Sequence, residues 1–240
     1  MGAILTPSLG VSAALLVVLG VGYRASAADF FIKDGVVRYT EDGGEPKAMN
    51  VGRRCADLWV APDSSIIAFV AIDESKVNPP FLLPGEEPLI ERSSIYVARR
   101  AEHFVPVRVL SKQFEVDGRT WGVLRYPSIA PDGNKLFLMI PYAMTTFRLM
   151  SCFIESGACQ DLGAVTDYCV VWGGSHSSAQ ILQRRHVEPE RAEGIIYSCD
   201  LRTTAGTSAI SESCPDFQKF ASGWAQGSGG TCTMPFDSGY

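Results

Sequence analysis

A short motif that occurs twice constrains the fold of this chain more than any other feature. Residues 127–138 read Pro-Ser-Ile-Ala-Pro-Asp-Gly-Asn-Lys-Leu-Phe-Leu, and residues 58–69 read Leu-Trp-Val-Ala-Pro-Asp-Ser-Ser-Ile-Ile-Ala-Phe. Each copy is a strand end, a Pro-Asp turn and a second apolar strand. In both, we expect the Asp to hydrogen-bond its own turn. A tight turn that recurs between strands indicates a repeated β-sheet unit. A weaker third copy is predicted around residues 174–182.

The rest of the chain is also rich in strand signals. Asp34-Gly35 separates two apolar runs at 30–33 and 36–39, which predicts a tight hairpin because this dipeptide accepts positive φ angles. Further runs rich in β-branched and aromatic residues cover 66–72, 94–98, 104–110, 136–140, 147–154 and 194–199. From residue 28 onward we find no apolar stripe with the helical period. The sequence therefore predicts an all-β protein.

Similar strands recur at a spacing that fits a β-propeller. Tyr39, Tyr96, Met150 and Tyr197 mark equivalent positions, separated by 57, 54 and 47 residues. A four-stranded propeller blade takes ~40–50 residues, so each interval is one blade with an insertion. The chain therefore has material for about four blades.

The turn at Ala130-Pro131-Asp132-Gly133 resembles the Ser-Pro-Asp-Gly turn of the TolB-like β-propeller repeat family, and the blades of prolyl oligopeptidase-like enzymes are similar. The copy at 59–69 departs from it, with Ser64 in place of Gly. The resemblance spans roughly residues 36–210 and implies a fold, because propellers serve many unrelated functions.

Members of that family usually have six or more blades. A chain with about four could form a small ring, a partial propeller with covered edges, or a propeller completed by a second chain. Residues 30–40 could also complete the last blade.

Three segments along the chain are predicted. Residues 1–27 resemble a secretory signal peptide, with an apolar run at 11–21 and Ala25-Ser26-Ala27 as the cleavage site. The run is shorter than the ~20 residues of a membrane span. An uncleaved anchor and N-myristoylation at Gly2 are the alternatives. Residues 28–212 are predicted to form the propeller repeats, and the Gly- and Ser-rich residues 213–240 a flexible tail.

The charge and the predicted signal limit partners and location. Cleavage would leave 20 Lys and Arg against 26 Asp and Glu, with no basic cluster. The sequence therefore shows no basic cluster of the kind that binds nucleic acid. We expect a periplasmic or secreted protein with no cofactor and no membrane span after cleavage.

The cysteines fit an exported protein. There are seven, so at least one lacks a partner within the chain. Cys152 with Cys159, and Cys199 with Cys214, bracket hairpin-like segments and are predicted disulfides. Cys169 fits a small buried apolar residue of a strand. The cysteines are Cys55, Cys152, Cys159, Cys169, Cys199, Cys214 and Cys232, and none has zinc-ligand spacing.

No catalytic pattern is complete. The nearest approach to a nucleophile elbow, around Ser175, lacks the final Gly and a following helix. His103, His176 and His186 are the three histidines, too few to indicate a triad or a metal site locally. Carboxylates for glycoside chemistry, such as Asp117, Asp161 and Asp167, stay possible because such pairs leave no local pattern.

Exposed apolar residues are the better candidates for a binding function. Phe81-Leu82-Leu83 lies among prolines in the insertion 73–93, and either contacts a partner or covers a sheet edge. Trp121 and Tyr142 sit near strand ends and either face a partner or belong to the core.

Taken together, the sequence predicts an exported, non-catalytic propeller that binds a protein or an envelope polymer. The alternative is an extracytoplasmic hydrolase or lyase that acts on a glycan or peptide in the propeller's funnel. A homodimer, with Cys232 bridging two chains, is a further hypothesis.

Overall fold

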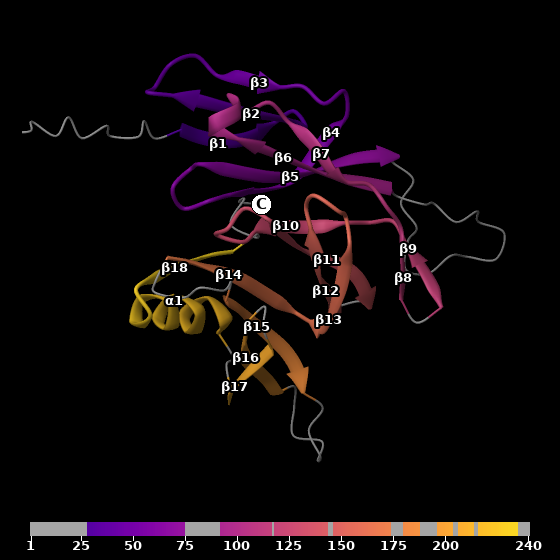
Figure 1. Ribbon diagram of the computed structural model, residues 1–240, viewed down its shortest axis with the longest axis vertical. Helices are drawn as coiled ribbons and strands as arrows, with labels where there is room; N and C mark the ends of the chain where they lie inside the picture. Colours follow the sequence, from indigo (N-terminus) through magenta and orange to yellow (C-terminus); the bar gives the residue numbers. More distant parts are fainter. Residues whose placement is uncertain are drawn as a thin grey trace, which may run out of the picture.

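The computed structural model describes residues 28–74, 92–116, 118–143, 146–173, 180–187, 196–203, 206–213 and 216–234. Four antiparallel sheets are arranged as the blades of a β-propeller (Figure 1). The first and last blades lie at opposite ends of the long axis of the molecule, with the second and third between them. The predicted all-β propeller of about four blades is confirmed.

The blades follow one another along the chain. The first contains β1 (Ala28–Lys33), β2 (Val36–Glu41) and β3 (Lys47–Met49). The second contains β4 (Arg54–Val60), β5 (Ile66–Glu74), β6 (Arg92–Arg99) and β7 (Val107–Leu110). The third contains β10 (Arg125–Ile129), β11 (Lys135–Ala143), β12 (Thr146–Phe153) and β13 (Cys159–Val165).

The fourth blade has a fifth strand. It contains β14 (Asp167–Gly173), β15 (Gln180–Val187), β16 (Ile196–Thr203), β17 (Gly206–Ser213) and β18 (Gly230–Thr233), which pairs with β14. Outside the blades lie the 3₁₀ turn η1 (Arg100–Glu102), a hairpin of β8 (Phe114–Val116) and β9 (Arg119–Trp121), and the helix α1 (Phe217–Gly227).

The two Pro-Asp turns have the same hydrogen bonds. The N–H of Ser64 donates to the carbonyl of Ala61 (2.8 Å), and that of Gly133 donates to Ala130 (2.9 Å). The carboxylates accept as predicted, Asp63 from the N–H of Ser65 (2.9 Å) and Asp132 from that of Asn134 (3.0 Å). Ser64 and Gly133 both have positive φ (55° and 70°), the conformation that glycine adopts most easily. Of the third copy predicted around residues 174–182, the turn at 174–179 lies outside the described residues, and residues 180–182 belong to β15.

The first blade corresponds to the last three strands of a full blade. Tyr39, Tyr96, Met150 and Tyr197 lie on β2, β6, β12 and β16, and the last three of these strands are each third in their blade. Strands β1 to β3 form a sheet of their own, so the idea that residues 30–40 complete the last blade is wrong. The predicted hairpin is confirmed, with positive φ at Asp34 and Gly35.

A separate apolar cluster packs each blade against the next. Phe69 belongs to the cluster between the first and second blades, and Trp59 and Leu138 to that between the second and third. Phe137 and Val170 belong to the cluster between the third and fourth. Because neighbouring residues of β11 point to opposite faces, Phe137 and Leu138 serve two different interfaces.

Polar groups join the first strands of the last three blades, β4, β10 and β14, which we call the inner strands. Arg125 of β10 pairs with the buried carboxylate of Asp57 on β4. The hydroxyl of Tyr168 on β14 donates to the carbonyl of Tyr126 (2.5 Å) and accepts from Ser128 (3.0 Å). Complete burial raises the pKa of Tyr168 well above its usual range. These ion pairs and hydrogen bonds therefore form one polar network that links the inner strands of the three blades.

The C-terminal segment is folded, so the expectation of a flexible tail over 213–240 is wrong for residues 216–234. Helix α1 is capped by Asp216, whose carboxylate accepts from the N–H of Lys219 (3.0 Å). Its apolar residues, Phe217, Phe220, Ala221, Trp224 and Ala225, pack on the outer face of the fourth blade. They follow the i, i+3, i+4, i+7 spacing of an amphipathic helix, which the sequence analysis overlooked.

The disulfides differ in part from those predicted. Cys152 is bonded to Cys159 as expected. Cys232 is bonded to Cys169 of the same chain, so the interchain bridge through Cys232 is wrong. Cys169 is buried in strand β14 as predicted, but it is a disulfide partner as well as an apolar residue. Cys199 is also in a disulfide, while its predicted partner Cys214 lies outside the described residues.

Cys55 is the free cysteine among the described residues. It is buried in β4, and burial raises the pKa of its thiol. The disulfides are consistent with an extracytoplasmic location. Of the helices in the described ranges, none is long and apolar enough to cross a membrane, and the predicted signal peptide at 1–27 lies outside those ranges.

Candidate binding site at a disulfide-closed hairpin

The hairpin that joins β12 to β13 is held closed by a covalent bond. Cys152 and Cys159 lie directly opposite each other in the two strands and form the disulfide. Above it, Phe153 and Ala158 are joined by a backbone hydrogen bond (2.8 Å), and the N–H of Gly157 donates to the carbonyl of Phe153 (2.9 Å). Gly157 has a positive φ of 65°, which allows this tight reversal. The loop 153–158 is therefore restrained at its base and within its turn.

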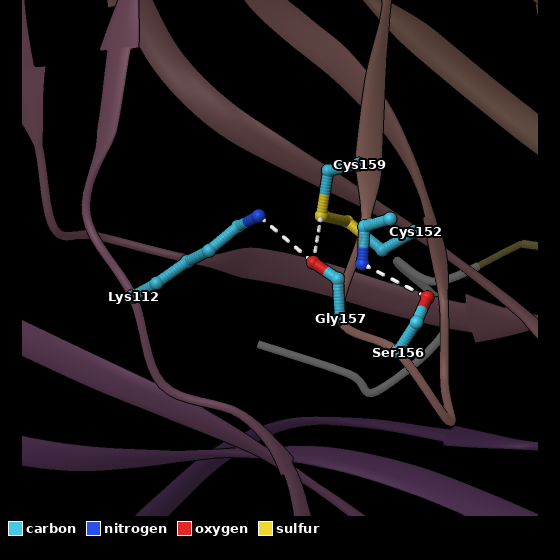
Figure 2. The surroundings of a disulfide bond; sticks show 6 residues. Lys112, Cys152, Ser156, Gly157 and Cys159 are labelled. Carbon is cyan, nitrogen blue, oxygen red and sulfur yellow. Dashed lines mark hydrogen bonds between the residues drawn. A yellow bond between two sulfur atoms is a disulfide. The ribbon is translucent and has the colours of Figure 1, made fainter.

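A side chain of the second blade contacts the tip of this hairpin. Lys112, which follows β7, donates from Nζ to the carbonyl of Gly157 at 2.9 Å (Figure 2). On the third blade, the N–H of Ile154 donates to the carbonyl of Asn134 (2.9 Å), and Ile154 packs against the cluster between the two blades. We call residues 153–158 the closed hairpin.

The closed hairpin carries an exposed aromatic side chain. Phe153 is 51% exposed, one of three large apolar residues exposed among the described residues, with Val105 and Val107. The ammonium of Lys135 lies 4.9 Å from the centre of its ring, within the range of a cation–π contact. An aromatic ring held in water by a restrained loop is a typical anchor for a binding partner.

A cavity of about 420 Å³ lies beside this ring. It is lined by residues 153–156 of the hairpin together with Arg99, Gly133 and Asn134. The guanidinium of Arg99 donates to the carbonyl of Gly133 at 3.2 Å, so the end of β6 is joined to the repeated turn of the third blade. The lining of this cavity thus combines the ring of Phe153, the guanidinium of Arg99, the amide of Asn134 and the carboxyl group of Glu155.

Two of the binding residues predicted from sequence are described by the structure, and neither lines this cavity. Trp121 and Tyr142 are half-buried and pack against the cluster between the second and third blades. The structure therefore brings them to the same core, and their contact with a partner stays a prediction. Phe81, Leu82 and Leu83 lie outside the described residues.

Of the carboxylates considered for catalysis, the two that the structure describes are each paired with an arginine. Asp161 pairs with Arg148 and Asp167 pairs with Arg184. His103 is exposed and ends η1. Within the described ranges, no group of three His, Cys, Asp or Glu side chains is placed to hold a metal ion. Asp117, Ser175 and His176 lie outside those ranges.

The hairpin and its disulfide were predicted from the sequence, but Phe153 was not recognised as a candidate binding residue. The Cys-x₆-Cys spacing was recognised, yet the residue next to the first cysteine, Phe153, reads as one more apolar residue of a strand. In an alternating strand, the register decides whether such a residue is buried, and the register follows from pairing with a distant strand.

Comparison with known proteins gives likeness in structure alone. The chain matches no protein-family model and no curated protein. Among solved structures, it is similar to a hydrazine synthase of Kuenenia stuttgartiensis, with 14% identity, a TM-score of 0.44, and coverage of 76% of this chain and 49% of that one. The chain thus spans about half of that protein's length.

Two further solved structures are similar to this chain. One is a puromycin-hydrolyzing peptidase of Mycobacterium tuberculosis, with 11% identity, a TM-score of 0.44, and coverage of 79% of this chain and 29% of that one. The other is a protein assigned as TolB from Agrobacterium tumefaciens, with 12% identity, a TM-score of 0.30, and coverage of 78% of this chain and 79% of that one.

Proposed function

We propose that this protein is an exported, non-catalytic β-propeller that binds a protein partner through the closed hairpin. The observation that carries the proposal is Phe153, an aromatic side chain 51% exposed on a loop that a disulfide closes. Rings of this kind supply much of the binding energy at protein interfaces when a partner covers them.

The restraint on the loop favours tight binding. Ordering a flexible loop on binding costs free energy, and a loop already fixed avoids that cost. Here the disulfide fixes the base, the Gly157 turn fixes the tip, and Lys112 ties the tip to the second blade. A partner would therefore meet the hairpin in its bound shape.

The surroundings of Phe153 fit a protein interface. Arg99 is a cation at the adjacent cavity, and arginine is enriched with aromatic residues at interface centres. The backbone amides, Asn134 and Glu155 supply polar groups at its rim. Of the carboxylates considered for the hydrolase alternative, Asp161 and Asp167 are each paired with an arginine, and Asp117 lies outside the described residues.

Site-specific photo-crosslinking in the native cell envelope tests the proposal. A photoreactive phenylalanine analogue replaces Phe153, and the matched control replaces Phe31, a partly exposed aromatic on β1 of the first blade. We expect one protein adduct at position 153 and none at position 31.

Purified components then separate the alternatives. Phe153→Ala is expected to weaken binding of the captured protein at least tenfold, and Phe31→Ala to leave it unchanged. Adducts of equal yield at both positions, or a captured polysaccharide instead of a protein, would contradict the proposal. Turnover of a peptide or glycan by the purified chain would favour the enzyme.

A further inference from the structure

A second cavity is lined in part by Lys112. It has a volume of about 260 Å³ and is lined by the end of β5, the start of β6 and the segment that follows β7. Its side chains are those of Asp73, Arg92, Ser93, Ser111, Lys112 and Gln113. Its location and lining are distinct from those of the cavity beside Phe153.

Among the described residues that line this cavity, Asp73 is the one with a carboxylate, and its charge is already neutralised. Asp73 lies 2.5 Å from the guanidinium of Arg53 and accepts a hydrogen bond from the hydroxyl of Ser94 at 2.6 Å. Its side chain is 14% exposed. An ion pair and a short hydrogen bond therefore compensate the negative charge of Asp73 before any ligand arrives.

The remaining groups are hydrogen-bond donors with capacity to spare. Across the ranges that the structure describes, the side chains of Arg92, Ser111 and Gln113 have no hydrogen-bond or ion-pair partner. Lys112 uses one of its three N–H donors on Gly157. The cavity thus presents two positive charges, a hydroxyl and an amide.

We propose that this cavity binds an oxyanion, the carboxylate or phosphate group of a small ligand. The guanidinium of Arg92 can hold two oxygens of such a group at once, and Lys112 supplies a second positive charge. Pockets for drug-sized ligands measure about 300–1,000 Å³, so a cavity of this size suits a single charged group with few attached atoms. We call it the oxyanion pocket. Lys112 belongs to this pocket and also contacts the closed hairpin, but the proposal does not depend on the hairpin's proposed partner.

Amide NMR titration of the full protein tests this assignment with two probes, inorganic phosphate and glucuronate. Sodium chloride at the same ionic strength is the blank. We expect saturable shifts of the amide signals of Arg92 and residues 111–113 with at least one probe. Tighter binding of phosphate would indicate a phosphorylated ligand, and tighter binding of glucuronate a carboxylate-bearing one. No saturable shift with either probe would overturn the proposal.

Two substitutions show whether the pocket itself is responsible. Arg92→Gln should weaken binding of the probe at least tenfold, because it removes the guanidinium that lines the pocket. Arg108→Gln, an exposed arginine of β7 outside the pocket, should leave the affinity unchanged. Equal weakening by both would show general attraction by surface charge and overturn the proposal. Unchanged thermal unfolding of both variants establishes that the fold is intact.

Discussion

Arg125 donates two hydrogen bonds to the carboxylate of Asp57, from Nε to Oδ2 at 2.5 Å and from Nη2 to Oδ1 at 3.1 Å. This pair joins the inner strands of the second and third blades. Asp57 also accepts from the backbone N–H of Tyr126 at 3.3 Å. Asp57 and Tyr126 occupy equivalent positions before the two Pro-Asp turns, and both have positive φ, 48° and 52°. The repeat therefore places a bulge in each inner strand, and the two bulges meet at this ion pair.

Loss of either partner should have unequal effects on stability. Arg125→Met would leave the Asp57 side chain, 3% exposed, as a buried charge without its cation, at a cost of about 3–5 kcal/mol. Asp57→Asn keeps an acceptor for Tyr126 and suits positive φ, and leaves an arginine that is 29% exposed and solvated. Its cost should be about 1–2 kcal/mol. Urea unfolding gives both values, and equal losses would contradict the assignment.

The turn that departs from the repeat should respond to glycine. Ser64 has φ of 55° where Gly133 has 70° in the equivalent turn. A non-glycine residue in this region costs about 1–2 kcal/mol, partly offset by the flexibility that glycine adds to the unfolded chain. Ser64→Gly should therefore raise the free energy of unfolding by about 0.5–1 kcal/mol. Gly133→Ser, the reverse exchange in the other copy, should lower it, and a loss in both would refute the equivalence.

The sequence was sufficient for the repeat and insufficient for the ends of the propeller. The Pro-Asp turns and the Asp34-Gly35 hairpin are local, because their residues satisfy their own backbone, so composition reveals them. Helix α1 also had a local signal, in Phe217, Phe220, Ala221, Trp224 and Ala225. It was obscured by the Gly- and Ser-rich residues that follow.

Long-range pairings could not be read from spacing. Cys169 and Cys232 are 63 residues apart, and they meet because β18 returns to pair with β14. Cys152 and Cys159 are 7 residues apart, so a hairpin brings them together. The exposure of Phe153 and the lining of both cavities likewise depend on which blades become neighbours, a tertiary property without a local pattern.

Tyr168 should make stability depend on alkaline pH. Its folded-state pKa is raised by burial, while tyrosine in the unfolded chain titrates near pH ~10. Above that pH the unfolded state releases a proton that the folded state keeps, so the free energy of unfolding falls as pH rises. Tyr168→Phe should cost about 1–3 kcal/mol at pH 7, because the carbonyl of Tyr126 loses its hydroxyl donor and the buried hydroxyl of Ser128 loses its acceptor.

The difference between wild type and Tyr168→Phe should then shrink as pH rises above about 10, as measured by urea unfolding at a series of pH values. Other tyrosines and lysines titrate equally in both proteins and cancel. A difference that stays constant to pH 12 would contradict the burial of this hydroxyl.

The helical cover of the fourth blade should be essential to stability. Phe217 is 4% exposed and packs with Ala221 and Leu182 in the outer cluster. Phe217→Ala should lower the free energy of unfolding by about 3–5 kcal/mol through lost burial and a cavity. Its neighbour Gln218 is exposed, and Gln218→Ala should change stability by less than about 0.5 kcal/mol. Similar values for the two would show that α1 does not pack on the blade.

The disulfide of the closed hairpin should contribute to stability through chain entropy. Its cysteines are 7 residues apart, and a loop of that size contributes about 2.5 kcal/mol in the entropy model. Cys152→Ala, Cys159→Ala and the double variant should lose similar amounts, because any one of them removes the whole bond. Urea unfolding tests this equality, and additive losses would indicate side-chain packing instead. Loss of the disulfide frees the loop. The same variants should therefore also bind the partner captured at Phe153 more weakly, mainly through faster dissociation.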